Sequence, residues 1–313
     1  MEYLRAVNFA PFSRRGLLAT DAARAELRRM QRLTGANAVI LCPGAVQDGP
    51  FADAIDFAGE HTTGDGELLD LTRFARSIGL RVFWKPTVNC LDGTWRARID
   101  FFDHEVPCET GWRNWFPAYA AFQLHFAALA AGAEVECLIL GCEMTQTERR
   151  EADWRALIAA VRRLYPGMLT YNCDKYGEEH VPFWDALDAV CSSGYYPIGD
   201  IPRQLDRIEP VVRRYGKPFF FAEAGCMRVA GSARVPNDWT LAGEPDDGEQ
   251  DRWYRALFAA VQGRPWFGGA ALWDWPLDAA HDSAYSFCHA PALGAIREHF
   301  ALSCAGRRAQ TEP

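Results

Sequence analysis

The chain has 313 residues, of which 49% are apolar and 24% are charged, and its 33 basic and 41 acidic side chains leave a net charge of −8. This balance is typical of a globular protein and excludes collagen, a coiled coil or intrinsic disorder for most of the chain. Because binding to a phosphate backbone depends on clustered Lys and Arg, we expect no nucleic-acid partner for an acidic chain without a basic run.

Eight short apolar runs follow one another along the chain, and each is rich in Val, Ile, Leu, Phe or Cys. Runs of this kind, with little polar alternation, are typical of parallel strands that are buried on both faces. We predict strands over residues 6–9, 38–42, 81–88, 137–142, 169–172, 189–192, 218–222 and 269–273.

Helical periodicity fills most of the intervals between these runs. Residues 67–78 show it most clearly, because Leu68, Leu71 and Ala75 belong to one apolar stripe and Gly79 ends the segment. We predict helices over residues 21–33, 67–78, 115–131, 151–164, 201–215, 250–261 and 292–300, with a short fifth connection that contains none.

Strands and helices that alternate in this way predict a single (β/α)8 TIM barrel, a fold that commonly needs about 250 residues. We expect the barrel to span residues 1–302 and to be followed by a polar, frayed tail over residues 303–313. The alternative is an open, doubly wound sheet, which usually has fewer strands and a glycine-rich phosphate turn. No G-x-G-x-x-G follows the first strand and no P-loop motif occurs, so the barrel is favoured.

The apolar runs and the cysteines also argue against a membrane helix, secretion, a zinc site and disulfides. No apolar run approaches the roughly 20 residues that a membrane helix needs, and no secretory signal pattern opens the chain. Most of the ten cysteines lie in strand-like runs without a C-x-x-C pair, as expected of buried free thiols rather than of zinc ligands or disulfides. We therefore expect no membrane partner, no metal site and a reducing, cytoplasmic location.

Two glutamates stand at the ends of predicted strands. Glu143 follows the fourth apolar run and Glu223 follows the seventh. Strand ends carry the catalytic groups of a barrel, and two carboxyl groups about 5 Å apart suit a retaining glycosidase. One would protonate the leaving oxygen while the other attacks the anomeric carbon, which requires surroundings that separate their pKa values. Either glutamate alone could instead pair with an arginine or cap a helix.

Aromatic side chains near the strand ends suit a sugar site, because the apolar C–H face of a pyranose ring stacks on an aromatic ring. The tryptophan candidates are Trp95, Trp112, Trp239, Trp273 and Trp275. For any one of them, packing in the core is the alternative. Polar candidates at the ends of the third and sixth runs are Lys85, Asn89, Tyr195 and Tyr196.

Taken together, these segments resemble glycoside hydrolase family 113 over nearly the whole chain, from about Val7 to Phe300. The resemblance rests on GKPFFFAEAG at residues 216–225, with PWFGG at 265–269 and WDW at 273–275. It also rests on WKP at 84–86, GTWR at 93–96, WFPAY at 115–119, GCE at 141–143 and YYPI at 195–198. The motifs are weak singly and fairly specific in combination.

The resemblance implies a (β/α)8 barrel of the large retaining clan, without a cofactor, that acts on β-1,4-linked mannan or manno-oligosaccharides. It implies that Glu143 is the acid/base and Glu223 the nucleophile, and that Tyr195 or Tyr196 hydrogen-bonds the nucleophile. It further implies sugar subsites lined by Lys85, Asn89, Trp95, Trp239 and Trp273.

Two departures from the wider clan bear on sugar preference. Cys142 stands before the acid/base where an asparagine that contacts the sugar 2-hydroxyl is common, and Cys226 stands where we expect an aromatic or larger polar residue. The alternatives are a retaining glycosidase or transglycosylase for another β-linked oligosaccharide, or a non-catalytic carbohydrate-binding barrel.

Overall fold

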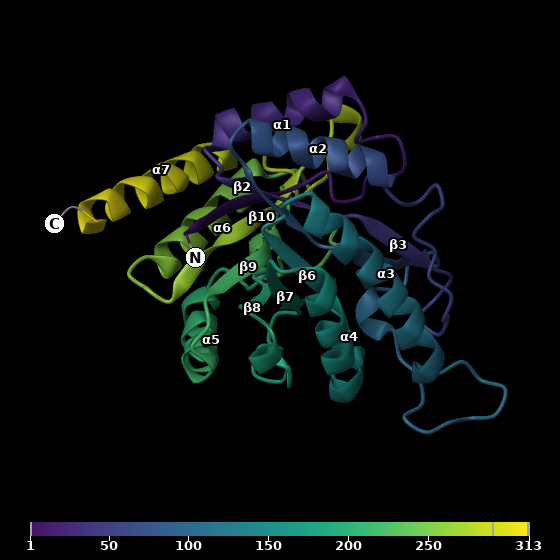
Figure 1. Ribbon diagram of the computed structural model, residues 1–313. Coiled ribbons are helices and arrows are strands. Elements are labelled where there is room, and N and C mark those ends of the chain that lie inside the picture. The colour runs from purple at the N-terminus through teal and green to yellow at the C-terminus, as the bar shows by residue number, and fades with distance from the viewer. Residues whose placement is uncertain (1, 290, 312–313) are drawn as a thin grey trace.

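The computed structural model describes residues 2–289 and 291–311. Eight parallel strands close into one barrel, in the order β1-β10-β9-β8-β7-β6-β4-β2, which confirms the predicted fold (Figure 1). The barrel strands are β1 (Leu4–Phe9), β2 (Ala38–Leu41), β4 (Arg81–Trp84), β6 (Cys137–Cys142), β7 (Met168–Cys173), β8 (Val190–Ser193), β9 (Phe219–Ala224) and β10 (Phe267–Trp275).

Helices cover the outside of the barrel, each following the strand that precedes it. They are α1 (Asp21–Thr34), α2 (Asp65–Ser77), α3 (Trp112–Gly132), α4 (Glu151–Leu164), α5 (Ile201–Tyr215), α6 (Asp247–Val261) and α7 (Ala292–Thr311). The connection from β7 to β8 holds only the short 3-10 helix η3 (Trp184–Ala186), as the sequence predicts. Further 3-10 turns are η1 (Arg96–Arg98), η2 (Thr145–Thr147), η4 (Ser232–Arg234) and η5 (Ala279–His281).

The predicted third strand is wrong in its extent, because the run over residues 81–88 divides in two. β4 ends at Trp84, and β5 (Thr87–Cys90) leaves the barrel to pair in parallel with β3 (Gly44–Gln47). Pro43 and Pro86 stand at the two points of departure, and proline cannot donate to a ladder hydrogen bond. The β3–β5 sheet therefore continues the β2–β4 pairing outside the barrel, beside the mouth.

The core has two layers. Inside the barrel, small side chains such as Ala6, Ala38 and Ala222 leave room for the facing rings of Phe83 and Phe220. A larger layer between the strands and the helices is rich in aromatic rings, including those of the buried residues Trp84, Trp115, Trp154, Trp184 and Trp253. The interior is thus filled by side chains, as in other barrels of this size, and chemistry is confined to the mouth.

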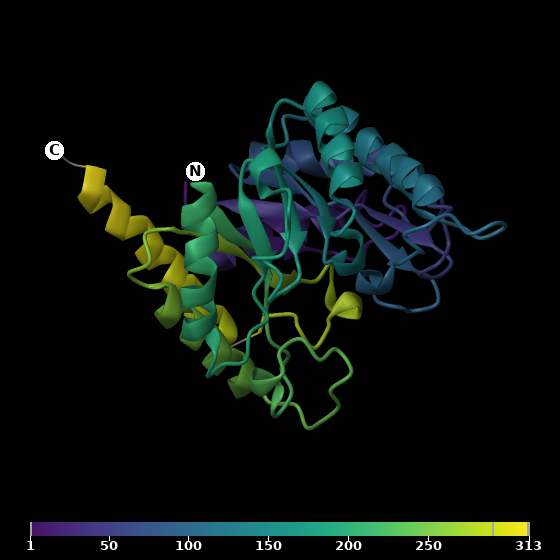
Figure 2. The same ribbon diagram turned by 90° about the horizontal axis from the view of Figure 1, so that it is seen from below.

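The carboxyl ends of the strands carry the longer connections. The connection between β9 and α6 projects from the barrel as a long loop (Figure 2). At the end of the chain, no break in α7 marks residue 302, and residues 312 and 313 of the expected tail lie outside the described residues. The boundary between barrel and tail stays a prediction. Within the described residues, no helix combines the length and apolarity needed to cross a bilayer.

Candidate active site

A bulge in β6 brings Glu143 to the barrel mouth. Ile139 pairs with Thr170 whereas Cys142 pairs with Asn172, so β6 holds one more residue than β7 over this interval. Gly141 lies there at φ 143°, and a Cβ at this position would come within 2.7 Å of the Tyr119 hydroxyl. Glu143 follows at φ 54°, in the left-handed region that costs energy for a residue with a side chain. Such outliers are typical of functional sites.

A second bulge turns Glu223 inward on β9. Ser192 pairs with Phe221 and Ser193 with Glu223, so β9 gains a residue relative to β8. Phe220 and Ala222 already face the interior, and strict alternation would turn Glu223 outward. The extra residue resets this alternation, as bulges beside active sites commonly do. One carboxylate oxygen of Glu143, one of Glu223 and the Cys142 Sγ then lie within 4.8 Å of one another.

Three donors surround the Glu223 carboxylate. Lys85 is 1% exposed and forms a salt bridge with Oε1, Cys142 Sγ lies 3.1 Å from the same oxygen, and the Tyr195 hydroxyl donates to Oε2 at 3.0 Å. Burial by itself would raise the pKa of Glu223. The Lys85 ammonium outweighs it, with help from Arg96 and Cys142, and holds this pKa below its ordinary value. Glu223 is therefore a carboxylate near neutral pH.

The Glu143 carboxyl group has a different set of neighbours. Ser193 Oγ donates to Oε1 at 2.6 Å, Trp95 Nε1 donates to Oε2 at 3.1 Å, and an Arg96 nitrogen lies 3.5 Å from Oε2. Burial raises the pKa of Glu143 to about 7, and the charges of Glu223 and Asp174 act in the same direction against Arg96 and Ser193. Near neutral pH this group can both give and accept a proton.

Aromatic rings form one wall of the mouth. The Lys85 Nζ lies 5.1 Å from the centre of the Trp273 ring, and Trp273 and Trp239 are 5.9 Å apart. Trp239 is half-exposed and packs 4.3 Å from Tyr285. Trp95 exposes 44% of its surface while its indole N–H is bound to Glu143, so its ring borders the Glu143 side of the mouth.

The structure does not bring Tyr196 and Trp275 to the two glutamates. Tyr196 follows the inward-facing Tyr195, so its hydroxyl points the other way and donates to the buried Glu178. Trp275 donates to Glu26 of α1 at 3.2 Å, because an irregularity between β1 and β10 changes the register after Leu272. Both positions belong to the packing between barrel and helices, which corrects their expected place among the sugar-binding residues.

Asn89 is linked to the site through the Arg96 side chain. Its Oδ1 accepts a hydrogen bond from the Arg96 guanidinium at 2.7 Å. Asn89 belongs to β5 outside the barrel, so the split of the third strand explains why it supports a neighbour of Glu143.

A comparison with models of protein families shows which family the chain belongs to. The model of Glycoside Hydrolase Family 113 matches residues 7–288. The chain belongs to this family. It is therefore a glycoside hydrolase, and the resemblance seen in the sequence is confirmed.

Solved structures of family 113 members are similar over nearly the whole chain. A complex of a β-1,4-mannanase of this family is 46% identical, with 96% of this chain and 99% of that chain covered and a TM-score of 0.94. The β-mannanase AaManA from Alicyclobacillus acidocaldarius, solved with ManMIm, is 37% identical over 97% of this chain and 98% of that one, with a TM-score of 0.92. No curated protein matches significantly.

More distant structures share the fold alone. A β-glucuronidase from Bifidobacterium dentium is 12% identical, with a TM-score of 0.64, and the match covers 96% of this chain and 46% of that chain. The common part is the barrel, which hosts many activities, so this likeness carries no information on the sugar.

The family 113 site also contains polar residues to which the sequence assigns no role. Arg96 closes the GTWR motif, Ser193 comes two residues before Tyr195, and Asn172 ends the fifth predicted strand. Asn172 Nδ2 lies 3.1 Å from both Cys142 Sγ and Ser193 Oγ, so Asn172 on β7 connects β6 with β8. The signal for Ser193 and Asn172 was a polar residue at the end of an apolar run.

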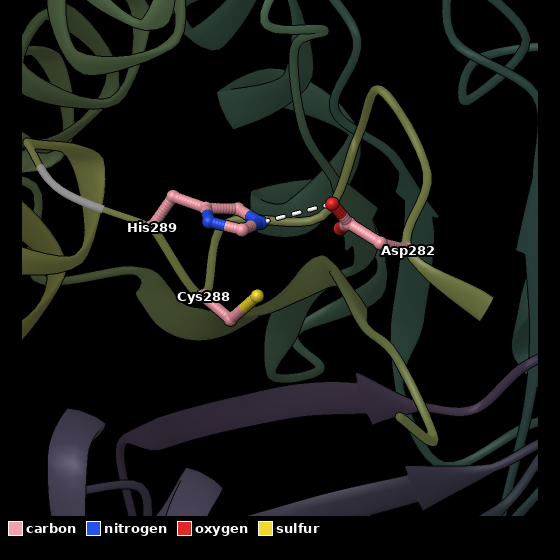
Figure 3. Close-up of side chains that lie close together, drawn as sticks. All are labelled: Asp282, Cys288 and His289. Carbon is pink, nitrogen blue, oxygen red and sulfur yellow. Dashed lines mark hydrogen bonds and ion pairs between the residues drawn. The ribbon is translucent and has the colours of Figure 1, made fainter. Parts of the chain in front are cut away.

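One further cluster has the residue types of a metal site. Asp282, Cys288 and His289, in the loop between β10 and α7, place one ligand-type atom each within 4.8 Å of one another (Figure 3). The Asp282 carboxylate already contacts His289 Nε2 at 3.0 Å and the Arg228 guanidinium at 3.0 Å. With its charge compensated by Arg228, this cluster ties down the loop that carries Tyr285.

Proposed function

We propose that this family 113 enzyme hydrolyses β-1,4-linked mannan or manno-oligosaccharides with retention of anomeric configuration. The observation that carries the mechanism is the separation of Glu143 and Glu223, whose nearest ligand-type oxygens lie within 4.8 Å. Retaining glycosidases place their carboxyl groups about 5–5.5 Å apart, whereas inverting enzymes need about 6.5–9.5 Å to admit a water molecule. The short separation supports direct attack by one carboxylate.

The opposite pKa shifts assign the two roles. Glu223, kept ionised by Lys85, attacks the anomeric carbon and forms a glycosyl ester. Glu143, with its pKa raised to about 7, protonates the departing glycosidic oxygen. Esterification removes the negative charge of Glu223, which is one cause of the raised pKa of Glu143. The pKa of Glu143 then falls, and the carboxylate can take the proton of the water that hydrolyses the ester.

The manno-configured substrate rests on the relatives and on the aromatic wall. The two family 113 structures compared above are a β-1,4-mannanase and a β-mannanase, at 46% and 37% identity. Trp95, Trp239 and Trp273 offer ring faces or edges at the mouth, where the sugar units on either side of the cleaved bond would stack.

A time course with β-1,4-mannopentaose tests the proposal. We expect shorter manno-oligosaccharides whose reducing-end signal in ¹H NMR first appears as the β-anomer. Glu223→Gln should reduce kcat at least about 10⁴-fold, because no other group can form the ester. Glu60→Gln is the matched control, since the Glu60 side chain is 88% exposed and should leave turnover unchanged. An unchanged pentaose would refute the mannan assignment, and first release of the α-anomer would refute retention.

We also propose a cytoplasmic location. Among the described residues, nine cysteines are free thiols, including the site residue Cys142 and the exposed Cys108, which suits a reducing compartment. Long mannan does not cross a membrane, so the substrates in that compartment would be imported short oligosaccharides. Fractionation of the native cells, followed by activity measurement, tests this location.

A further inference from the structure

Arg96 is a fixed cation beside the acid/base glutamate. Its Nε donates to the Val88 carbonyl at 3.1 Å, and another nitrogen donates to Asn89 Oδ1 at 2.7 Å. The remaining nitrogen faces Glu143 Oε2 at 3.5 Å and Cys142 Sγ at 3.8 Å. With 15% of its side chain exposed and two anchors on the backbone and side chain of β5, the guanidinium has little freedom to turn away.

The anchors come from the small sheet outside the barrel. Val88 and Asn89 belong to β5, which pairs with β3, and Arg96 itself opens η1 a few residues later. A regular third barrel strand over residues 81–88 would place neither anchor there. The split at Pro86 thus provides a platform for a cation that approaches Glu143 from the side opposite Ser193.

The two cations of the site serve different carboxylates. Lys85 forms its salt bridge with Glu223, whereas within residues 2–289 and 291–311 only Arg96 among Lys and Arg side chains lies within 4.0 Å of a Glu143 oxygen. The ionisable groups that face Arg96 from the neighbouring strands are Glu143, Glu223 and the thiols of Cys42, Cys90 and Cys142. Glu143 additionally faces Asp174 and the hydroxyls of Tyr195 and Tyr285.

We propose that Arg96 is a positioning residue for the acid/base, held by the β3–β5 sheet to orient the Glu143 carboxyl group. This inference rests on the proposed function, because it assigns a role within the same site. Trp95 and Arg96 approach the same oxygen, Oε2, which leaves Oε1 to Ser193 and fixes the plane of the carboxyl group.

The physical reason lies in the opposing effects on Glu143. Burial and the charge of Glu223 raise the pKa of Glu143 to about 7, and the charge of Arg96 is the strongest influence that lowers it. Arg96 also lowers the pKa of Glu223, after Lys85. Loss of the guanidinium charge should therefore move both titrations to higher pH. The acidic limb of kcat/KM reports ionisation of Glu223, and the basic limb reports deprotonation of Glu143.

The test compares Arg96→Met, Arg96→Lys and the control Arg98→Met. Arg98 lies on the same η1 turn and is exposed, so its variant removes the same charge without touching the site. For Arg96→Met we expect both limbs of the pH profile of kcat/KM on β-1,4-mannopentaose to shift to higher pH by about 1 unit. The reason is that a cation at this range shifts the pKa of a carboxyl group by about 1–3 units. Arg96→Lys should restore the limbs but not the full rate. Arg98→Met should match the wild type.

A second measurement keeps this inference separate from the proposed function. ¹³C NMR titration of carboxyl-labelled glutamate, with the Glu143 signal assigned by its loss in Glu143→Gln, reports the Glu143 midpoint without any substrate. Arg96→Met should raise that midpoint, whatever sugar the enzyme cleaves. If the wild type leaves mannopentaose intact and the midpoint still rises, the mannan assignment fails and the positioning role stands. An unmoved midpoint would overturn the positioning role.

Asn89→Leu provides the test if Arg96→Met does not fold. This variant keeps the cation and removes one anchor, so the guanidinium can move away from Glu143. We expect a smaller rise of the Glu143 midpoint and lower kcat with little change in KM. Wild-type kcat and midpoint in Asn89→Leu would overturn the role of the β5 anchor.

Discussion

The surroundings of Glu143 and Glu223 differ more than their positions do. Both carboxyl groups are buried at the same mouth, with 8% and 4% of the residue exposed, and both accept hydrogen bonds. Lys85 is in direct contact with Glu223, whereas the cation beside Glu143 lies at 3.5 Å, beyond hydrogen-bonding distance. The pKa of Glu223 is lowered and that of Glu143 is raised to about 7. Similar burial thus accompanies opposite pKa shifts, because at Glu223 the direct contact with a cation outweighs desolvation.

Removal of Lys85 is the strongest way to break this contrast. In Lys85→Met, Glu223 would lose the strongest influence that lowers its pKa and would become protonated near neutral pH. We expect kcat/KM to fall by about 10³-fold at pH 7, together with a loss of roughly 3 kcal/mol of unfolding free energy, as is typical when one partner of a buried ion pair is removed. Denaturant unfolding at pH 7 measures this loss.

A double variant separates the ion pair from simple packing. Lys85→Met with Glu223→Gln removes both charges, so it should recover most of the stability that Lys85→Met loses, while remaining inactive. A double variant as unstable as the single one would show that Lys85 stabilises the barrel by its packing on Trp273 rather than by its charge.

The two isosteric glutamine variants should change stability in opposite directions. The folded-state pKa of Glu143 is raised, so its favourable contribution is complete below the unfolded pKa near 4.5 and is lost as pH rises through about 7. At pH 8, the free energy of unfolding of Glu143→Gln should therefore exceed that of the wild type by about 2 kcal/mol, and at pH 4 the two should be equal.

Glu223→Gln should show the reverse. The folded pKa of Glu223 is lowered, so its contribution is present above the unfolded pKa and is lost as pH falls through the folded pKa. The variant leaves Lys85 buried without a counter-charge and should be destabilised by about 2 kcal/mol at pH 8. Thermal melts of both variants at pH 4 and pH 8 check the signs. Shifts of the same sign at pH 8 would contradict the electrostatic difference between the two sites.

The sequence predicts the barrel, and it predicts that Glu143 and Glu223 stand at strand ends, for a common reason. Apolar runs such as residues 137–142 report burial on both faces, and a charged residue that directly follows such a run marks a strand end. The apolar runs do not predict which face of a strand a given side chain occupies. Tyr195 and Tyr196 carry the same local signal, yet only Tyr195 reaches Glu223, because side chains alternate across a strand.

Bulges and long-range contacts limit the prediction further. Strict alternation fails at Glu223 and between Trp273 and Trp275, since the register shifts are set by neighbouring strands rather than by the local sequence. Arg96 has no signal of its own, because its role depends on β5 leaving the barrel and on Glu143 lying 47 residues further along the chain. Such pairings depend on the closed barrel and are absent from any short segment.

The smallest expected effect sharpens the contrast at Glu143 alone. Ser193 Oγ donates to Glu143 Oε1 at 2.6 Å and lowers the pKa of Glu143, but it is not among the causes of the pKa shift of Glu223. Ser193→Ala should shift the basic limb of the kcat/KM profile to higher pH by about 0.5 unit and leave the acidic limb in place. The neighbouring Ser192→Ala is the matched control, since the Ser192 hydroxyl is buried without a hydrogen-bond partner. A shift of both limbs in Ser193→Ala would mean that Ser193 acts on the whole site, as Arg96 does, and that the two carboxyl groups cannot be tuned independently.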